Sequence, residues 1–243
     1  KLMKKILLFL TFTSLILSSC RKDDDNTTTT PEVSLETQNS YDDEAIQKFL
    51  KDNYFDSRGN IVAFSSTSTA DDNEKPLFNY NVIKLNSGVV YISRYTPTNG
   101  KTIGATDKIS ILQKTTTYVA TKDSKGTVSF STPIAFRNTV TSGTGNPEYD
   151  PSYYYVKDDV LNAYNTAYNK TYTRTFYEIE GLQEGLKYFQ SCEIPNSENY
   201  NLQGVIIIPS RAAFARDDAF PYLGSMKDKS FVFNFQIYKT ETR

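Results

Sequence analysis

The sequence predicts an α+β domain in which β-strands dominate and one helix comes first. Tyrosine and phenylalanine are abundant, at 18 and 15 residues, and they lie among threonine-rich stretches spaced by glycines. Aromatic and β-branched residues fit the pleated, half-buried surface of a strand. From Phe78 onward, short apolar runs alternate with turn residues. A segment near residue 45 instead has apolar residues at helical spacing.

Residues 1–19 have the pattern of a lipoprotein signal peptide. Lys4 and Lys5 precede an apolar run from Ile6 to Leu17. This run is too short for a bilayer core, which needs about 20 residues, but it has the length of a signal-peptide core. Two serines then stand directly before Cys20, as at sites where a cysteine is lipidated. We therefore expect Cys20 to be the lipid anchor of an exported protein.

Residues 20–39 are expected to form a disordered tether. Asp23 to Thr30 is acidic and then consists of Asn and Thr, so it has no apolar side chain to bury. The acidic start resembles the surface-export signal of lipoproteins in the Bacteroidetes, and a plain solvated linker is the alternative. The expected location is the cell envelope, lipid-anchored to the outer membrane and either periplasmic or surface-exposed.

Residues 40–78 are expected to form a helical annex and a loop, outside a β-rich domain that spans residues 79–243. The helix is predicted over Ser40 to Asn53, because Ser40 and Asp43 can together cap a helix start. Ala45, Ile46, Phe49 and Leu50 then lie on one face.

Strands and turns alternate through the β-rich domain. A short strand at Ile61–Phe64 precedes it, and the closing strand ends at Tyr238. Asp123–Gly126 is predicted to be a turn because it combines Asp, Ser and Gly. The other predicted strands are Tyr80–Lys84, Gly88–Ile92, Lys108–Leu112, Thr117–Ala120, Thr127–Phe130, Val205–Ile208 and Ser230–Tyr238.

Residues 138–174 are expected to form a long, tyrosine-rich insertion. Glycines and prolines come first, followed by Tyr153–Tyr155 and a helical stretch from Asp158 to Tyr168. We favour packing of these tyrosines against the sheet, and an exposed aromatic contact surface is the alternative.

Missing residue types exclude several kinds of chemistry. The chain has no histidine, which removes Ser-His and Cys-His nucleophiles and the usual zinc ligand sets. We therefore expect no metal and no cofactor. The net charge is −1 and no basic run occurs, so nucleic acid is not an expected partner. Once Cys20 is lipidated, Cys192 has no partner within the chain for a disulfide.

Three segments in the last third resemble the FKBP-type peptidyl-prolyl isomerases, in the lipoprotein form found in Bacteroidetes. The family has V-I-x-G-W-x-E-G-L, then I-I-P-x-x-x-A-Y-G, then a closing L-V-F-x-V-x-L strand. Here the corresponding segments are Glu178–Leu186, Ile207–Ala215 and Phe231–Ile237. The resemblance implies an antiparallel β-sheet wrapped on a short helix that begins near Gly181, with Val205–Ile208 beside the final strand.

The resemblance also implies a substrate pocket. In the family, the backbone N–H at the position of Ile179 binds a substrate carbonyl. Gln113 and Ser131 would stand where the family has tyrosine and aspartate, Leu182 replaces its floor tryptophan, and Phe214 replaces a tyrosine. The expected apolar pocket residues are Phe130, Ile179, Leu182, Phe214 and Phe233.

Such a pocket would make the chain a peptidyl-prolyl cis-trans isomerase, a folding helper that acts on proline-containing polypeptides. Twisting an X-Pro bond requires no nucleophile or metal, and an apolar pocket with fixed donors can favour the twisted state. The altered polar positions predict weak activity. The alternatives are a catalytically weak FKBP-like module that binds peptides, a structural surface lipoprotein, and a carbohydrate-binding β-sandwich. The sequence leaves the substrate and the oligomeric state open.

Overall fold

A computed structural model of the chain describes residues 32–140, 146–222 and 224–243. The signal peptide and most of the tether, including Cys20, lie outside the described residues. The helices are α1 (Leu35–Asp52), α2 (Asp158–Tyr168) and α3 (Glu180–Leu186). The strands are β1 (Asn53–Phe55), β2 (Ile61–Ala63), β3 (Ile83–Lys84), β4 (Val90–Ser93), β5 (Lys108–Lys122), β6 (Val128–Asn138), β7 (Glu148–Tyr149), β8 (Gly204–Ile208) and β9 (Lys229–Glu241).

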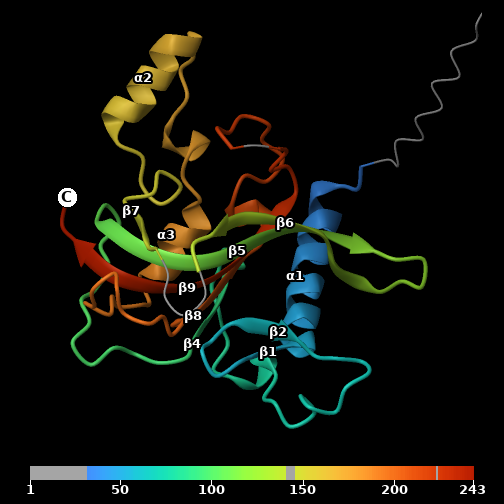
Figure 1. Cartoon of the computed structure of the whole chain (residues 1–243). Coiled ribbons are helices and arrows are strands. Elements are labelled where there is room, and N and C mark those ends of the chain that lie inside the picture. The colour runs from blue at the N-terminus through green and yellow to red at the C-terminus, as the bar shows by residue number, and fades with distance from the viewer. Residues whose placement is uncertain (1–31, 141–145, 223) are drawn as a thin grey trace, which may run out of the picture. The chain divides into compact units, whose positions relative to one another are not determined.

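The main sheet is antiparallel and has the order β3-β4-β8-β9-β5-β6, with β7 added alongside β5 (Figure 1). The predicted neighbours β8 and β9 pair directly, with Ile206 opposite Phe233. Helix α3 begins at Glu180, one residue before the position that the resemblance implied. The expected α+β class and the short helix against an antiparallel sheet are therefore confirmed.

One face of the sheet packs on α3. Ile179, Leu182 and Leu186 from α3 and its N-cap contact apolar side chains of β8 and β9. Gly181 permits this close packing, because a Cβ there would lie 2.4 Å from Cγ2 of Ile208. We call this buried group the α3-side core; its sheet members include Ile206, Ile208, Phe231, Phe233 and Phe235.

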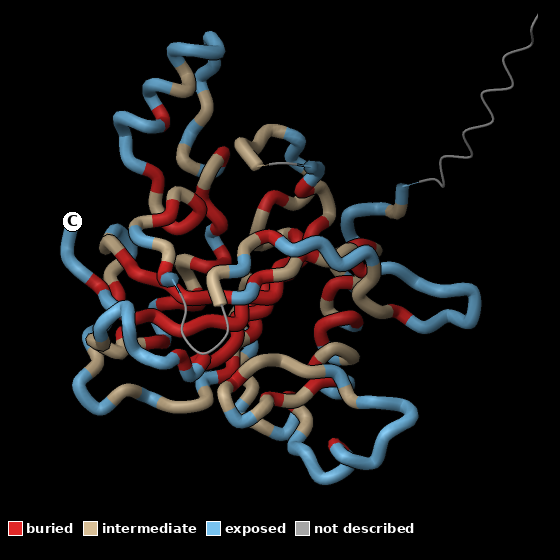
Figure 2. Tube along the Cα trace, viewed as in Figure 1, coloured by how far each residue is buried: buried red, intermediate tan, exposed pale blue. Residues whose placement is uncertain are grey.

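The opposite face packs on α1, which contributes Ile46 and Leu50. Side chains alternate between the faces of a strand, so the neighbours of the α3-side residues form a second core of Val90, Ile92, Val205, Ile207 and Val232. Figure 2 shows buried residues concentrated in the sheet and in the parts of α1 and α3 that contact it.

Helix α1 differs from its prediction in two respects. It starts at Leu35 instead of Ser40, because the Ser34 side chain accepts a hydrogen bond from the Thr37 amide. Residues 35–39, assigned to the tether, are therefore helical. The helix also packs on the sheet instead of lying outside the β-rich domain, and Val33–Arg243 form one compact unit. Its apolar stripe shields a sheet face that would otherwise be exposed to water.

Strand β5 is continuous where two strands were predicted. The polar stretch after Leu112 suggested a break, but Gln113, Thr115 and Thr117 are all buried. Their polar groups have partners: Thr115 Oγ1 donates to Gln113 Oε1 at 2.5 Å, and Thr117 Oγ1 donates to the Ile134 carbonyl at 3.3 Å. Buried polar groups with partners carry little penalty, so the strand continues.

The insertion leaves the sheet after β6 and returns at α3. It holds β7 and α2, and α2 spans the predicted residues 158–168. Figure 1 shows α2 projecting away from the sheet. Among the described residues, no helix is long and apolar enough to span a bilayer.

Candidate functional site

Four of the five predicted pocket residues lie together in the α3-side core. Ile179 caps α3, Leu182 lies within it, Phe233 lies on β9, and Phe214 follows the 3-10 turn Ser210–Ala212. Ile179, Leu182 and Phe233 are 0% exposed and Phe214 is 4% exposed. These residues form a filled apolar core, not the walls of an open cleft.

Phe130 does not join them, so its prediction was wrong. It lies on the α1 side of the sheet, where its ring centroid is 5.8 Å from that of Phe49 and 5.0 Å from that of Tyr118. The register pairs Phe130 with Ala120, whose side chain faces α1. The hairpin of β5 and β6 extends past the α3-side core, and Phe130 lies in that extension.

Phe136 occupies the position that was expected for Phe130. Its ring centroid is 5.2 Å from Phe231 and 6.4 Å from Phe233. Between Phe130 and Phe136 the pairing shifts register, at a bulge near Thr132, whose φ is 46°. A one-residue bulge moves the side chains that follow it to the other face of the strand. Strict alternation counted from Phe130 therefore assigns the residues after Thr132 to the wrong face of β6. The spacing of Ile134 and Phe136 is the sequence signal that could have identified this side.

The two predicted polar replacements also separate. Gln113 is fully buried beside the core, and its Nε2 donates to the Tyr153 hydroxyl. Ser131 lies in the hairpin extension, where its Oγ donates to the Val119 carbonyl at 3.0 Å. Only Gln113 is therefore near the expected pocket.

The tyrosine-rich insertion fills the space beside Ile179. The Ile179 N–H donates to the Tyr153 carbonyl at 2.8 Å, so the donor expected for a substrate carbonyl is already used. Tyr153 is 1% exposed, and its hydroxyl donates to Glu148 at 2.7 Å. Burial, followed by the charge of Glu148, raises the pKa of Tyr153 well above its ordinary value. Its phenol is therefore a fixed hydrogen-bond donor.

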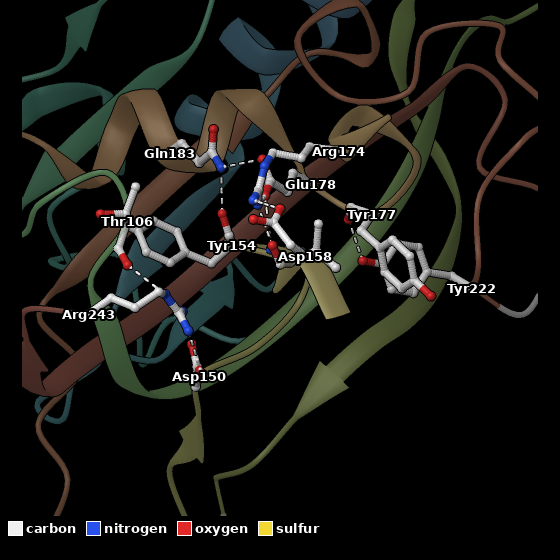
Figure 3. A network of polar contacts seen from close by, with 11 residues as sticks. Thr106, Asp150, Tyr154, Asp158, Arg174, Tyr177, Glu178, Gln183, Tyr222 and Arg243 are labelled. Carbon is white, nitrogen blue, oxygen red and sulfur yellow. Dashed lines mark hydrogen bonds and ion pairs between the residues drawn. The ribbon is translucent and has the colours of Figure 1, made fainter. Parts of the chain in front are cut away.

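A network of polar contacts holds the next residues of the insertion against α3 (Figure 3). Gln183 Nε2 donates to the Tyr154 carbonyl and to Glu178. Glu178 Oε1 accepts from the Val156 N–H at 2.9 Å, and Arg174 donates to the Val156 carbonyl. Together with the Ile179–Tyr153 hydrogen bond, these contacts fix the backbone at Tyr153, Tyr154 and Val156.

Two arginines complete this network. The guanidinium carbons of Arg174 and Arg243 each lie 4.3 Å from the Tyr155 ring centroid. Arg243 also forms an ion pair with Asp150. Burial raises the pKa of Asp150, but hydrogen bonds from Arg243 and Lys157 outweigh that effect and leave the pKa below its ordinary value. Residues 150–156, which cover the expected pocket, are therefore held in place by hydrogen bonds and ion pairs.

An open space remains at the margin of the same core. We call it the β6 cavity: about 320 Å³, between β6 and the loop that precedes β9, lined by Thr117, Ile134, Ala135, Phe136, Arg137, Pro221, Tyr222 and Met226. Phe136 and Tyr222 connect it to the core, with ring centroids 5.2 Å apart. The Tyr222 hydroxyl donates to the Tyr177 carbonyl, and burial raises the pKa of Tyr222.

Arg137 is the charged residue of the β6 cavity. Its guanidinium carbon lies 4.9 Å from the Phe136 ring centroid, and its Nε is 3.7 Å from Glu148. A guanidinium has five donors. The cavity therefore combines an apolar volume with a cation at its edge, which suits an apolar side chain next to a carbonyl or carboxylate. Within the described residues, no group of Asp, Glu, Cys or His could hold a metal ion.

No protein-family model and no curated protein matches the chain. Solved structures that it resembles include a peptidyl-prolyl cis-trans isomerase from Pseudomonas syringae pv. tomato, at 14% identity over 66% of this chain and 81% of that one, with a TM-score of 0.33. FkpA from Escherichia coli is 15% identical over 66% and 52% of the two chains, with a TM-score of 0.31. The three FKBP domains of wheat FKBP73 are 10% identical over 68% and 50%, with a TM-score of 0.33.

Proposed function

We propose that this chain is an FKBP-like, lipid-anchored protein of the cell envelope that binds proline-containing polypeptides and isomerises them slowly. One observation carries the proposal: the Ile179 N–H is bonded to the Tyr153 carbonyl, whereas the β6 cavity, on the edge of the same core, is open. Binding is therefore assigned to the β6 cavity, and strong catalysis at Ile179 is not expected.

The expected low rate follows from the physics of the peptide bond. Rotation about an X-Pro bond faces a barrier of about 20 kcal/mol. A site that lowers this barrier must hold the substrate carbonyls with donors aimed in advance. Here the backbone donor has an internal acceptor, and Phe214 has no hydroxyl to contribute. A substrate would have to displace Tyr153 and the contacts that hold it.

Binding is supported by the lining of the β6 cavity. Its apolar members are Ile134, Phe136, Pro221 and Met226, and a proline or aliphatic side chain would exclude water from them. Arg137 stands beside this apolar volume and can donate to a peptide carbonyl. No bound metal or nucleophile is needed for this role.

Anchoring through Cys20 is part of the same proposal and is supported by the signal-peptide pattern. In cells, Cys20→Ser should release the mature protein from membranes or leave the uncleaved precursor. Metabolic labelling with a radioactive fatty acid measures this directly. Unchanged processing and unchanged label in Cys20→Ser would contradict the anchor.

Two measurements on the soluble chain test binding and catalysis separately. Fluorescence anisotropy should show saturable binding of a labelled proline-containing peptide, and Ile134→Asp should weaken it at least tenfold, because a charge would enter the apolar cavity. Val160→Asp on α2 is the matched control, since Val160 is also an exposed aliphatic residue. A protease-free isomerisation assay should show only slight acceleration. Fast turnover that survives Ile134→Asp would contradict the proposal.

A further inference from the structure

The β6 cavity combines buried apolar surface with a single charge. Its most buried lining residues are Phe136, Met226 and Thr117, which are 8%, 6% and 2% exposed. Ile134 and Arg137 belong to its more exposed part. Among the described residues that line the cavity, Arg137 alone carries a charge. The charge of this lining therefore favours a ligand whose own charge is negative.

The guanidinium of Arg137 is held in a fixed position. Its carbon lies 4.9 Å from the ring centroid of Phe136 and 5.7 Å from that of Tyr153. Its Nη1 donates to the Phe136 carbonyl at 3.0 Å. Aromatic faces and a backbone acceptor together orient a planar guanidinium before any ligand arrives.

This oriented guanidinium still has free donors. The nearest carboxylate is that of Glu148, whose Oε1 lies 3.7 Å from Nε of Arg137, too far for a hydrogen bond. The other oxygen of Glu148 accepts from the Tyr153 hydroxyl at 2.7 Å. Nη2 of Arg137 has no hydrogen-bond partner within residues 32–140, 146–222 and 224–243. The side chain can therefore bind a second anion.

A guanidinium fork matches the two oxygens of a carboxylate, and the apolar lining favours a group that leaves water. A suitable ligand has both groups close together. The last residue of a polypeptide has them on one carbon atom, if its side chain is apolar. The volume of about 320 Å³ is at the lower end for ligand pockets, which suits one such residue better than a long acyl chain.

A free amino acid fits this lining less well than a chain end. Its ammonium group would lie beside its carboxylate, and therefore close to the positive charge of Arg137. Within the described part of the chain, no acidic residue lines the cavity to compensate that ammonium. At the end of a polypeptide the same nitrogen is a neutral amide, so the conflict does not arise.

We propose that the β6 cavity binds the C-terminal residue of a polypeptide, with the apolar side chain in the cavity and the carboxylate on Arg137. The inference rests on the proposed polypeptide binding and names the part of the polypeptide that is bound. Capture of a terminal carboxylate is a known mode of peptide recognition. It selects chains whose last residue is apolar and accessible, as in an unfolded or cleaved protein.

The test uses the soluble chain and two forms of the fluorescein-labelled peptide Gly-Ser-Thr-Pro-Thr-Leu, one with a free carboxylate and one with a C-terminal amide. In fluorescence anisotropy, the acid form should bind at least tenfold more tightly than the amide form, about 1.4 kcal/mol. Arg137→Gln should remove most of this difference by weakening the acid form alone. Lys239→Gln is the control, because it removes an exposed positive charge on β9 and should leave the difference intact.

Two further measurements complete the test. A urea unfolding curve close to that of the parent protein would show that Arg137→Gln is folded. Unlabelled N-acetyl-leucine should displace the acid form, whereas free leucine should require at least a tenfold higher concentration. Equal displacement by the two would identify a free amino acid as the ligand and overturn the inference.

The remaining outcomes separate this inference from the proposed function. If the acid and amide forms bind equally well, the chain end is not recognised, so the inference fails and the proposed function stands. If the preference for the acid form survives Arg137→Gln, another group binds the carboxylate and the inference is again wrong. If neither form binds, the proposed function itself fails.

Discussion

The α3-side core has two margins, one at Ile179 and one at β6, and only the first is covered by other residues of the chain. At the Ile179 margin, the insertion supplies Tyr153, and every polar group described there has a partner within the chain. At the β6 margin, Ile134 is half exposed, and a cavity of about 320 Å³ remains. The same apolar core is therefore closed on one side and open on the other.

Because of this difference, one margin contributes to stability and the other is accessible to a ligand. A closed margin adds stability, because buried hydrogen bonds with partners and excluded water both favour the folded state. An open margin leaves apolar area and the Arg137 guanidinium for a ligand. The proposed binding at β6 does not depend on the polar groups that the proposed isomerisation would need at Ile179.

The largest expected effect tests whether the closed margin is truly packed. Phe233→Ala should lower the free energy of unfolding by about 3–5 kcal/mol, because Phe233 is 0% exposed and its removal leaves a cavity. Ile134→Ala at the open margin should lower it by less than about 1 kcal/mol. Urea denaturation followed by tyrosine fluorescence measures both. Equal losses would remove the distinction between the margins.

The second prediction concerns the network that fixes the insertion. Glu178 is 7% exposed and accepts hydrogen bonds from Val156, Arg174 and Gln183. Glu178→Ala should destabilise the protein by about 2–4 kcal/mol, because three buried or half-buried donors lose their acceptor. Limited proteolysis should then cut within the insertion.

The control for that variant is Glu180→Ala, since Glu180 is an exposed glutamate only two residues further along, at the start of α3. It should leave the proteolysis pattern unchanged. If Glu178→Ala resists cleavage as the parent protein does, the insertion is held by its apolar contacts alone. The polar network would then contribute little to the closed margin.

The third prediction restores a hydroxyl at the expected pocket. Phe214→Tyr should not raise isomerase activity, because Phe214 is 4% exposed and the neighbouring donor Ile179 is already bonded. It should lower the free energy of unfolding by about 1–3 kcal/mol, since the new hydroxyl enters an apolar site. A clear gain in turnover would show that the Ile179 margin opens in solution.

The smallest expected effect is the pH dependence of the Arg243–Asp150 pair. The pKa of Asp150 is below its ordinary value in the folded state, so the pair contributes stability above about pH 4, and this is lost as pH falls through the folded-state pKa. Asp150→Asn removes the contribution. Urea titrations should show the variant less stable by under about 1 kcal/mol at pH 6, with the difference vanishing near pH 2. A constant difference would exclude the charge as its cause.

Much of the fold followed from local patterns. The apolar run at Val205–Ile208 predicted a central strand, and the motif around Gly181 predicted a short helix; the structure confirms both. The predicted helix at 158–168 has the same first and last residues in the structure. Each of these elements depends on spacing within a few neighbours, which a single sequence displays.

The candidate site was harder because it depends on contacts between distant residues. The face of Phe130 depends on the register of β6 against β5, and two register shifts lie between Lys122 and Lys114. The closure of the Ile179 margin depends on the backbone carbonyl of Tyr153. Every residue has such a carbonyl, so no pattern of side chains in the sequence predicts this contact. The apolar stripe of α1 predicted that one side of the helix is buried. It did not predict that this side packs on the face of the sheet opposite α3.

Helix α1 also has a consequence for how the chain folds. Most of its contacts with the sheet are with β5 and β6, but Ile46 and Leu50 also belong to the core that includes Val205, Ile207 and Val232 of β8 and β9. The buried Asp42 accepts hydrogen bonds from Ser210, 168 residues later. During synthesis from the N-terminal end, the core around Ile46 and Leu50 is therefore incomplete until β8 and β9 have been made. Contacts so far apart in sequence slow folding. We expect the first helix to dock in one of the last steps, and the unfolded chain to need protection from aggregation until then.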